Sequence, residues 1–367
     1  MKKRFFWLFL LFFFLLPINV LAERDLSMIG GQNFLIADQA DGRILLGHKA
    51  DEKVPVASTA KIITIYRTLE AVYNGELSWE QRVKMSENLV ELSKDDFLGN
   101  VEFQADKEYT VLDLFQSALL ASSNSATIFL GELISGSNEG FIVETRQWLK
   151  DIGLSEFTFV SPSGLELIDL QDFGLSPSDA PHATSATTPG TFNLFSAYDI
   201  AVIAYRMIQD FPEVLETASQ GNVELSNGET VFTLNAFFEY EENGIWFNGL
   251  KTGFTPFAQS SYVGYAYKGD KRVIIVTLQT LDYITDGLEL SRLAFTDVAN
   301  GEMTGSQRTT LSDIRPIKKE VIETKETTKE EEPVVVWQSI QPRMPTLPTI
   351  LTGIAVLLLG FYFLMKK

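Results

Sequence analysis

The order of sequence patterns along the chain limits its fold more than any other feature. Residues 33–47 (NFLIADQADGRILLG) form two apolar runs around Asp41 and Gly42, which predicts a β-hairpin with a tight turn. β-rich runs return only from residue 245, in IWFNGLKTGF and SSYVGYAYKGDKRVIIVTLQT, followed by a helix over roughly 286–298. This order predicts an α+β domain whose first and last segments share one antiparallel sheet with flanking helices.

Helical patterns occupy the region between these strands. After the stretch VPVASTAK (54–61), apolar residues recur at helical spacing through Val72, which places Ser58 in the first turn of a helix. Thr110-Val-Leu-Asp113 is typical of a capping box and opens a second helix, which ends before the break ASSNS (121–125). Further helices are predicted over 126–134 and 198–207, and residues 76–109 are polar and irregular.

Both ends of the chain are strongly apolar. Residues 1–22 have a basic start, an apolar run and small residues before Glu23, which predicts a secretory signal peptide, with an uncleaved membrane anchor as the alternative. Residues 346–365 are uncharged and long enough to cross a bilayer, and Lys366 and Lys367 follow as a cytoplasmic tip. A buried core helix is the alternative for this segment. We expect a single-pass protein in the cell membrane with its domain outside.

The region between the ends divides into a domain, 23–304, and a solvated linker, 305–345, that is rich in Lys, Glu and Thr. The formal net charge is −18, and about −23 without the five basic residues at the two ends, so nucleic acid is not an expected partner. The chain has no cysteine and only His48 and His182, so we expect no metal site and no cofactor. The loop over 166–195 is either a lid near a site or an unstructured insertion.

Three short motifs carry the chemistry. Ser58 and Lys61 form S-x-x-K at a helix start, where residues three apart lie on one face. A lysine acts as the base for a serine nucleophile when it is neutral, which burial and a second cation promote. Lys251, in K-T-G on a predicted strand, is a candidate for that cation; Thr252 offers a hydroxyl to a carboxylate, and Gly253 permits close backbone approach.

The third motif is S-x-N, formed by Ser122 and Asn124 at the break between two helices. A second copy, Ser86-Glu87-Asn88, shows that this motif alone has little specificity. The order and setting of the three motifs together resemble the penicillin-binding serine DD-peptidases, and among them the small D-alanyl-D-alanine carboxypeptidases. The stretches DGRILLGHKAD, YTVLDLFQSALLASSN, FVSPSGL, SAYDIA and NGLKTGFT also resemble that family.

The resemblance covers residues 30–300 and implies an antiparallel sheet with an all-helical subdomain. It also implies that Ser58 attacks the amide between two terminal D-alanines of a peptidoglycan stem peptide, with Lys61 as base, and that β-lactams acylate Ser58. By the same resemblance, Ser122 relays a proton to the leaving amine, and Asn124 holds the peptide amide. The remaining roles implied are carboxylate binding by Lys251 and Thr252 and an oxyanion hole from the backbone N–H groups of Ser58 and Phe254, next to Gly253.

The chain departs from the family pattern at three places: Ser125 replaces a frequent Asp, Phe254 replaces a frequent His, and the 166–195 loop is long. The usual second, β-rich domain is also missing. Three other readings stay open. A class A β-lactamase needs a deacylating glutamate in E-x-x-L-N, which Glu166–Leu170 does not match. Endopeptidase or transpeptidase action would proceed through the same acyl-enzyme. The third alternative is a catalytically inactive module that only binds the cell wall.

Overall fold

The computed structural model describes residues 26–185, 188–238, 240–296, 302–304 and 308–311. The helices, including the 3₁₀ turn η1, are η1 (Ala57–Ala60), α2 (Lys61–Tyr73), α3 (Glu87–Ser93), α4 (Val111–Leu119), α5 (Asn124–Ser135), α6 (Asn138–Asp151), α7 (Leu167–Gln171), α8 (Ala197–Asp210), α9 (Val214–Ala218) and α10 (Tyr283–Phe295). The strands are β1 (Asn33–Asp38), β2 (Ile44–His48), β3 (Val54–Pro55), β4 (Arg82–Val83), β5 (Tyr109–Thr110), β6 (Leu194–Phe195), β7 (Asn222–Glu224), β8 (Thr230–Phe232), β9 (Tyr240–Glu242), β10 (Ile245–Thr255), β11 (Gln259–Lys268), β12 (Lys271–Thr280) and β13 (Glu302–Thr304).

The main sheet joins the two ends of the described domain. Its strand order is β13-β2-β1-β12-β11-β10-β9, and β1 from the start of the domain pairs antiparallel with β12 from its end, as the order of sequence patterns predicts. The predicted hairpin of β1 and β2 is confirmed, although five residues rather than a tight two-residue turn connect its strands. Strand β13 is an exception to the antiparallel prediction, because it pairs parallel with β2.

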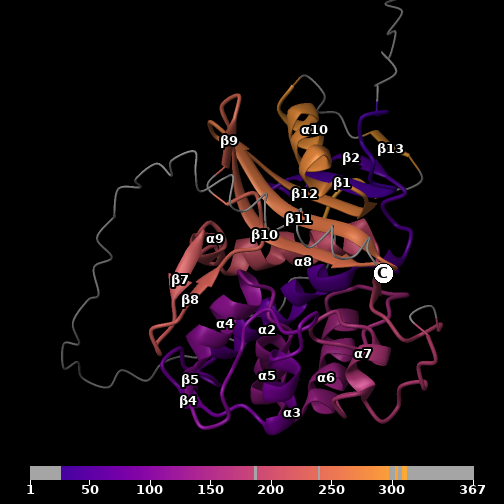
Figure 1. Ribbon diagram of the computed structural model, residues 1–367. Coiled ribbons are helices and arrows are strands. Elements are labelled where there is room, and N and C mark those ends of the chain that lie inside the picture. Colours follow the sequence, from indigo (N-terminus) through magenta and orange to yellow (C-terminus); the bar gives the residue numbers. More distant parts are fainter. Residues whose placement is uncertain (1–25, 186–187, 239, 297–301, 305–307, 312–367) are drawn as a thin grey trace, which may run out of the picture. The chain divides into compact units, whose positions relative to one another are not determined.

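Side-chain alternation explains why this sheet is covered on both faces. Along β1, Leu35 and Ala37 belong to the larger apolar core, whereas Phe34 and Ile36 belong to a second core that includes Leu290 of α10. A strand directs successive side chains to opposite faces, so a strand that is apolar at every position needs cover on both sides. Helix α8 supplies that cover on one face and α10 on the other (Figure 1). The predicted α+β class is therefore confirmed.

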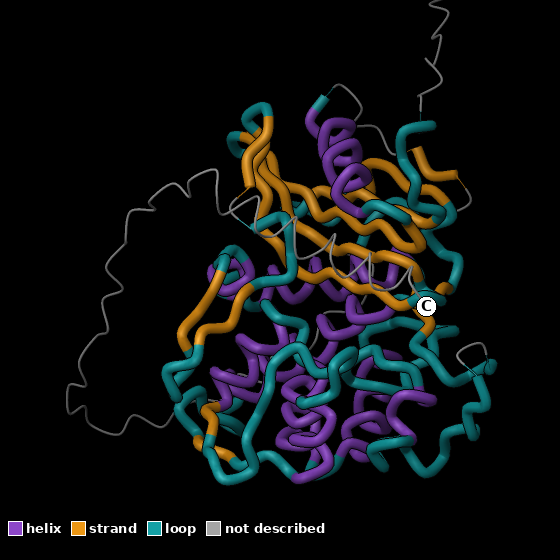
Figure 2. Tube along the Cα trace, in the orientation of Figure 1, coloured by secondary structure: helices purple, strands orange, loops and turns teal. Residues whose placement is uncertain are grey.

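The second part of the fold consists of helices that lie beneath the sheet (Figure 2). Helix α4 begins at the predicted capping box, in which the Thr110 side chain accepts from the Asp113 backbone N–H and Asp113 accepts from the Thr110 N–H. The predicted helix over 126–134 begins slightly earlier, at Asn124, and ends at Ser135; Gly136 follows with a left-handed φ of 78°. Helices α3 and α6 were not predicted from the sequence.

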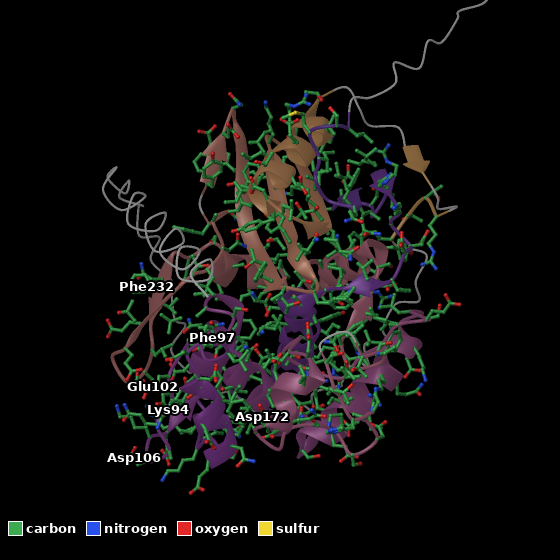
Figure 3. All side chains as sticks on the ribbon, turned by 45° about the vertical axis from the view of Figure 1, so that its right-hand side comes forward. Lys94, Phe97, Glu102, Asp106, Asp172 and Phe232 are labelled. Atoms are coloured by element: carbon green, nitrogen blue, oxygen red, sulfur yellow. The ribbon has the colours of Figure 1, made fainter. Side chains whose placement is uncertain are left out.

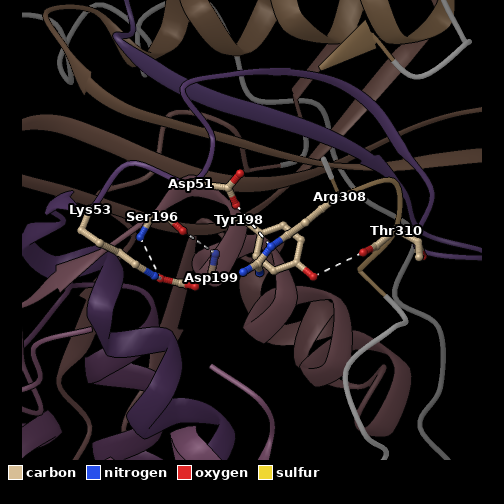
Figure 4. A network of polar contacts seen from close by, with 7 residues as sticks. All are labelled: Asp51, Lys53, Ser196, Tyr198, Asp199, Arg308 and Thr310. Carbon is tan, nitrogen blue, oxygen red and sulfur yellow. Dashed lines mark hydrogen bonds and ion pairs between the residues drawn. The ribbon is translucent and has the colours of Figure 1, made fainter. Parts of the chain in front are cut away.

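Residues 308–311, which fall within the predicted linker, pack against the domain. The Leu311 side chain is fully buried in the larger core, and its backbone N–H donates to Gly42 O at 2.7 Å. Arg308 lies over the Tyr198 ring and 3.5 Å from Asp51, and the Tyr198 hydroxyl donates to Thr310 O (Figure 4). Composition did not predict that residues 308–311 pack against the domain, because a single apolar residue among polar ones carries no periodic signal.

The rest of the predicted linker, together with the signal peptide (1–22) and the spanning segment (346–365), lies outside the described residues. No helix within the described ranges has both the length and the apolar character needed to cross a bilayer.

Candidate active site

The predicted nucleophile and base are in direct contact. Ser58 lies in the 3₁₀ turn η1 and Lys61 is the first residue of α2, so one helical turn brings Lys61 Nζ to 2.9 Å from Ser58 Oγ. Ala57, directly before the serine, has φ of 48°, a left-handed conformation that is strained for a residue with a side chain. Such strained positions cluster where a fold holds a side chain in a functional position.

Two further acceptors surround the Lys61 amine. Asn124 Oδ1 lies 2.6 Å from Nζ, and the main-chain oxygen of Ser163 also lies 2.6 Å away. Lys61 is completely buried. Burial, reinforced by the charge of Lys251, lowers the pKa of Lys61 well below its usual value. The expectation that Lys251 acts as a second cation near Lys61 therefore agrees with the electrostatics of the site.

Lys251 itself is buried in strand β10, where its Nζ donates to Thr252 O at 2.8 Å. Burial lowers the pKa of Lys251 to about 7. No acidic side chain in the described part of the chain is bonded to Lys251, so an incoming carboxylate would meet a cation that no protein carboxylate already pairs.

Gly253 determines how closely β10 approaches the nucleophile. A Cβ at this position would lie 2.8 Å from the backbone nitrogens of both Ser58 and Thr59 and 2.6 Å from Ser261 Oγ, distances that no real Cβ tolerates. Glycine therefore lets the strand press against the turn that carries Ser58. Phe254 follows immediately, and its side chain is largely exposed.

Ser122 lies in the break between α4 and α5 with φ of 59°. Its main-chain oxygen accepts from the Asn100 side chain at 3.0 Å, and the Asn124 amide group donates to Leu98 O at 2.7 Å. These contacts fix the break against the 94–100 loop. Among the described residues, the Ser122 hydroxyl makes no hydrogen bond to Ser58, Lys61 or Lys251. Thr252 is half-buried between Lys251 and Gly253.

The second S-x-N copy lies elsewhere. Ser86 is the exposed residue before α3, and the Asn88 side chain donates to Phe173 O. Neither contacts the site residues. His48 stacks on Phe34 in the main sheet, and His182 lies exposed in the long loop, so both lie apart from the site, as the sequence predicts.

Sequence reasoning missed the residues that hold the Ser163 carbonyl in place. The Asn193 side chain accepts from the backbone N–H groups of Val160 and Ser161 and donates to Ser161 O. Gly164 has a φ of 79° and packs closely on Ala57. A Cβ on Gly164 would lie 2.1 Å from the main-chain oxygen of Ala57. The sequence marks the FVSPSGL stretch only through its family resemblance. For Asn193, no sequence signal indicated a role.

The 166–195 loop is ordered along its described length. Asn138 Nδ2 donates to Leu175 O at 2.7 Å and Arg146 pairs with Asp179 at 2.7 Å, so the middle of the loop is fixed to α6. Both ends of the loop meet the end of β10. Thr255 hydrogen-bonds the carboxyl of Glu166, whose pKa is raised by burial, and the Phe192 ring lies 4.9 Å from that of Phe257. The loop therefore supports the site from one side.

Comparison with known proteins decides the family. The sequence profile of Peptidase_S11, D-alanyl-D-alanine carboxypeptidase, matches residues 21–281. The chain belongs to the D-alanyl-D-alanine carboxypeptidase family Peptidase S11. Among curated relatives, the D-alanyl-D-alanine carboxypeptidase DacF of Bacillus subtilis is 25% identical over 245 residues, covering 66% of this chain and 55% of DacF.

Solved structures of the family share this fold. The peptidoglycan synthesis regulatory factor PBP3 of Streptococcus pneumoniae is 30% identical, with a TM-score of 0.65 over 73% of each chain. Penicillin-binding protein D2 of Listeria monocytogenes, solved in its cefotaxime-bound form, is 27% identical, with a TM-score of 0.58 over 72% of this chain and 96% of that one. The first curated relatives are longer, and this chain spans 55 to 63% of their length.

Proposed function

We propose that this protein is a serine D-alanyl-D-alanine carboxypeptidase that removes the terminal D-alanine from peptidoglycan stem pentapeptides. The observation that carries the proposal is the buried Lys61 amine, 2.9 Å from Ser58 Oγ, with its pKa lowered by burial and by the charge of Lys251. A lysine in this state acts as the base for a serine without any histidine. Membership of the carboxypeptidase family supports the same reaction.

The contacts of Lys61 determine which atom gives the proton and which accepts it in the proposed reaction. A neutral amine has two N–H donors and one lone pair, and Asn124 Oδ1 and Ser163 O accept the two donors. The lone pair is left facing Ser58 Oγ, so the Ser58 hydroxyl donates to it. Attack by Ser58 on the amide carbonyl transfers this proton to Lys61, and the proton leaves with the D-alanine amine through Ser122. Water then hydrolyses the ester and regenerates Ser58.

The remaining residues bind and polarise the substrate. Developing negative charge on the carbonyl oxygen is held by the backbone N–H groups of Ser58 and Phe254. The close approach of Gly253, the neighbour of Phe254, to the Ser58 turn supports this assignment. The D-alanine carboxylate binds Lys251 and the Thr252 hydroxyl. Asn124, already bonded to Lys61, offers its amide group to the peptide. None of these steps requires a metal or cofactor.

The proposal predicts that β-lactams acylate Ser58, as the cefotaxime-bound structure of the Listeria relative suggests. The full-length protein in detergent micelles is incubated with penicillin, and the adduct is located by mass spectrometry of its peptides. We expect an adduct on Ser58 that persists for minutes, and release of one D-alanine from a synthetic pentapeptide. Ser58→Ala abolishes both.

Matched controls separate the site from its surroundings. Ser122→Ala slows D-alanine release, whereas Ser86→Ala, in the other S-x-N copy, leaves it unchanged. Rapid turnover of penicillin would instead make the protein a β-lactamase. If Ser58→Ala still formed the penicillin adduct and released D-alanine, Ser58 would not be the nucleophile.

We also propose that the domain works on the outer side of the cell membrane, held by a spanning helix over 346–365. The apolar, uncharged character of this segment and the two lysines after it support that location. The test is fractionation: the full-length protein should stay with membranes after a high-salt wash and be cut by protease added to intact spheroplasts. A chain ending at residue 345 should appear in the medium.

A further inference from the structure

Asn193 is a buried polar residue that no step of the proposed reaction uses, and it is only 2% exposed. Its Oδ1 accepts from the backbone N–H groups of Val160 at 2.8 Å and Ser161 at 3.2 Å. Its Nδ2 donates to Ser161 O at 2.8 Å. One side chain thus satisfies three backbone groups of a buried segment, which would otherwise lack partners. Asn193 therefore fixes the backbone at Val160 and Ser161.

The backbone that Asn193 fixes leads directly to the catalytic base. Ser163 O, two residues after Ser161, accepts from Lys61 Nζ at 2.6 Å. Between them, Ser161 Oγ accepts from the Ser163 backbone N–H at 3.3 Å, and the two serine hydroxyls lie 3.0 Å apart. A series of hydrogen bonds therefore connects Asn193, through Ser161 and Ser163, with the amine of Lys61.

Helix α2 contacts the same segment at two positions one turn apart. The Thr64 hydroxyl donates to Pro162 O at 3.0 Å, and the Lys61 amine donates to Ser163 O. Both bonds are buried. Consecutive carbonyls of the segment thus face α2, while Asn193 pairs with the backbone groups directly before them. The direction of the Ser163 carbonyl depends on both sets of contacts, because a close-packed interior leaves the segment little freedom.

Asn193 belongs to the end of the 166–195 loop. The loop passes Asp172, which lies at the end of α7 on the helical side of the molecule, below the main sheet (Figure 3). At its base, the Leu167 backbone N–H donates to Thr191 O at 2.8 Å. Leu194 then exchanges two backbone hydrogen bonds with Thr158, at 2.9 and 3.0 Å. These pairings determine where Asn193 meets the segment that precedes Ser163.

We propose that Asn193 is a positioning residue for the base Lys61, acting through the carbonyl of Ser163. This inference rests on the proposed function of Ser58. A neutral amine has two N–H groups; Asn124 Oδ1 accepts one and Ser163 O the other, so the lone pair faces Ser58 Oγ. If Ser163 O moves away, the amine can rotate about its Cε–Nζ bond. The lone pair then faces the Ser58 hydroxyl for only part of the time.

This role affects proton transfer and not substrate binding. Among the described residues, Asn193 makes no hydrogen bond to Lys251 or Thr252, the residues proposed to bind the carboxylate. Loss of the Asn193 side chain should therefore slow acylation of Ser58 in the bound complex. The affinity of the complex that precedes acylation should stay the same.

The experiment measures penicillin acylation of the full-length protein in micelles by rapid quench over a range of penicillin concentrations. It yields the acylation rate constant at saturation and the dissociation constant of the preceding complex. For Asn193→Ala we expect the rate constant to fall about tenfold and the dissociation constant to stay unchanged. Ser161→Ala, a smaller change in the same series of bonds, should also lower the rate constant.

Asn138→Ala is the matched control. Asn138 is also a buried asparagine, and its side chain donates to a main-chain oxygen of the same loop, Leu175 O, at 2.7 Å. It is not bonded to the segment that precedes Ser163. This variant should keep the wild-type rate constant.

The final labelled fraction counts the molecules with a folded site, so misfolding lowers that fraction without changing the rate constant. A wild-type rate constant for Asn193→Ala, a loss confined to its dissociation constant, or an equal slowing by Asn138→Ala would overturn the proposal. If Asn193→Ala does not fold, Ser161→Ala decides, and an unchanged rate constant there would overturn it. A wild-type protein that neither labels nor releases D-alanine would instead show that the proposed function has failed.

Discussion

The amide oxygen of Asn124 lies 2.6 Å from the amine of Lys61, although the two residues are 63 positions apart in the chain. The bond joins the start of α5 to the start of α2. It holds the Lys61 amine at the Ser58 side of its pocket and uses one of the two N–H groups that a neutral amine offers. The chemistry proposed for Ser58 therefore depends on how two helices pack.

Replacing Asn124 tests this dependence. Asn124→Asp places a negative charge beside Lys61 and should raise the pKa of the amine, because an opposite charge favours the protonated form. At neutral pH, penicillin acylation should fall about tenfold or more, and the rising limb of the pH profile should move to higher pH. Asn124→Ala should lower the rate without that displacement.

The control for this pair is Asn88→Asp, in the other S-x-N copy, which should leave the pH profile where it is. Stopped-flow measurement of acylation from pH 5 to 10 distinguishes these results. If the rising limbs of the pH profiles of Asn124→Asp and the wild-type protein coincided, Asn124 would not set the protonation of Lys61.

Gly253→Ala should separate the backbone of β10 from the Ser58 turn. The added methyl would lie 2.8 Å from Ser58 N, so the strand has to move outward. A displacement of about 1 Å at a reacting centre costs on the order of 10²-fold in rate. Acylation by penicillin should fall by that order. Gly30→Ala, where a Cβ meets only atoms at 3.6 Å, is the control and should retain full activity.

The pH profile of D-alanine release should have two limbs with opposite signs. The rate rises with pH as Lys61 loses its proton, because only the neutral amine accepts the Ser58 proton. It falls above about pH 7 as Lys251 loses the charge that binds the substrate carboxylate, since burial lowers its pKa to about 7. Lys251→Arg, which stays charged, should extend the plateau to alkaline pH. A falling limb that this variant does not move would assign it to another group.

Leu311→Ala should destabilise the domain, because the fully buried side chain leaves a cavity in the core. Such changes cost about 2–5 kcal/mol. The midpoint of urea unfolding, followed by tryptophan fluorescence, should fall accordingly. Leu281→Ala, at an 87% exposed position, should shift it little. Equal midpoints would place residue 311 outside the cooperative unit.

Local patterns were enough for much of the fold. The capping box at Thr110 and Asp113, the apolar spacing of α8 and the long strands β10 to β12 were all predicted, because each depends on neighbours in sequence. Helix α6 was missed because two of its five buried residues, Asn138 and Thr145, are polar, so few apolar residues mark its buried face. The short helix α3 was missed for another reason: its seven residues are too few to show a repeat within a region that is otherwise polar and irregular.

The sequence by itself determined which residues form the candidate site, because Ser58 and Lys61 are one helical turn apart and the three motifs occur in a recognisable order. Only the tertiary structure decided their chemical state. Burial of Lys61, its bonds to Asn124 and Ser163, and the charge of Lys251 come from segments about 60 to 190 residues away. A pKa depends on solvent and charges in space, and these are set by packing rather than by spacing along the chain.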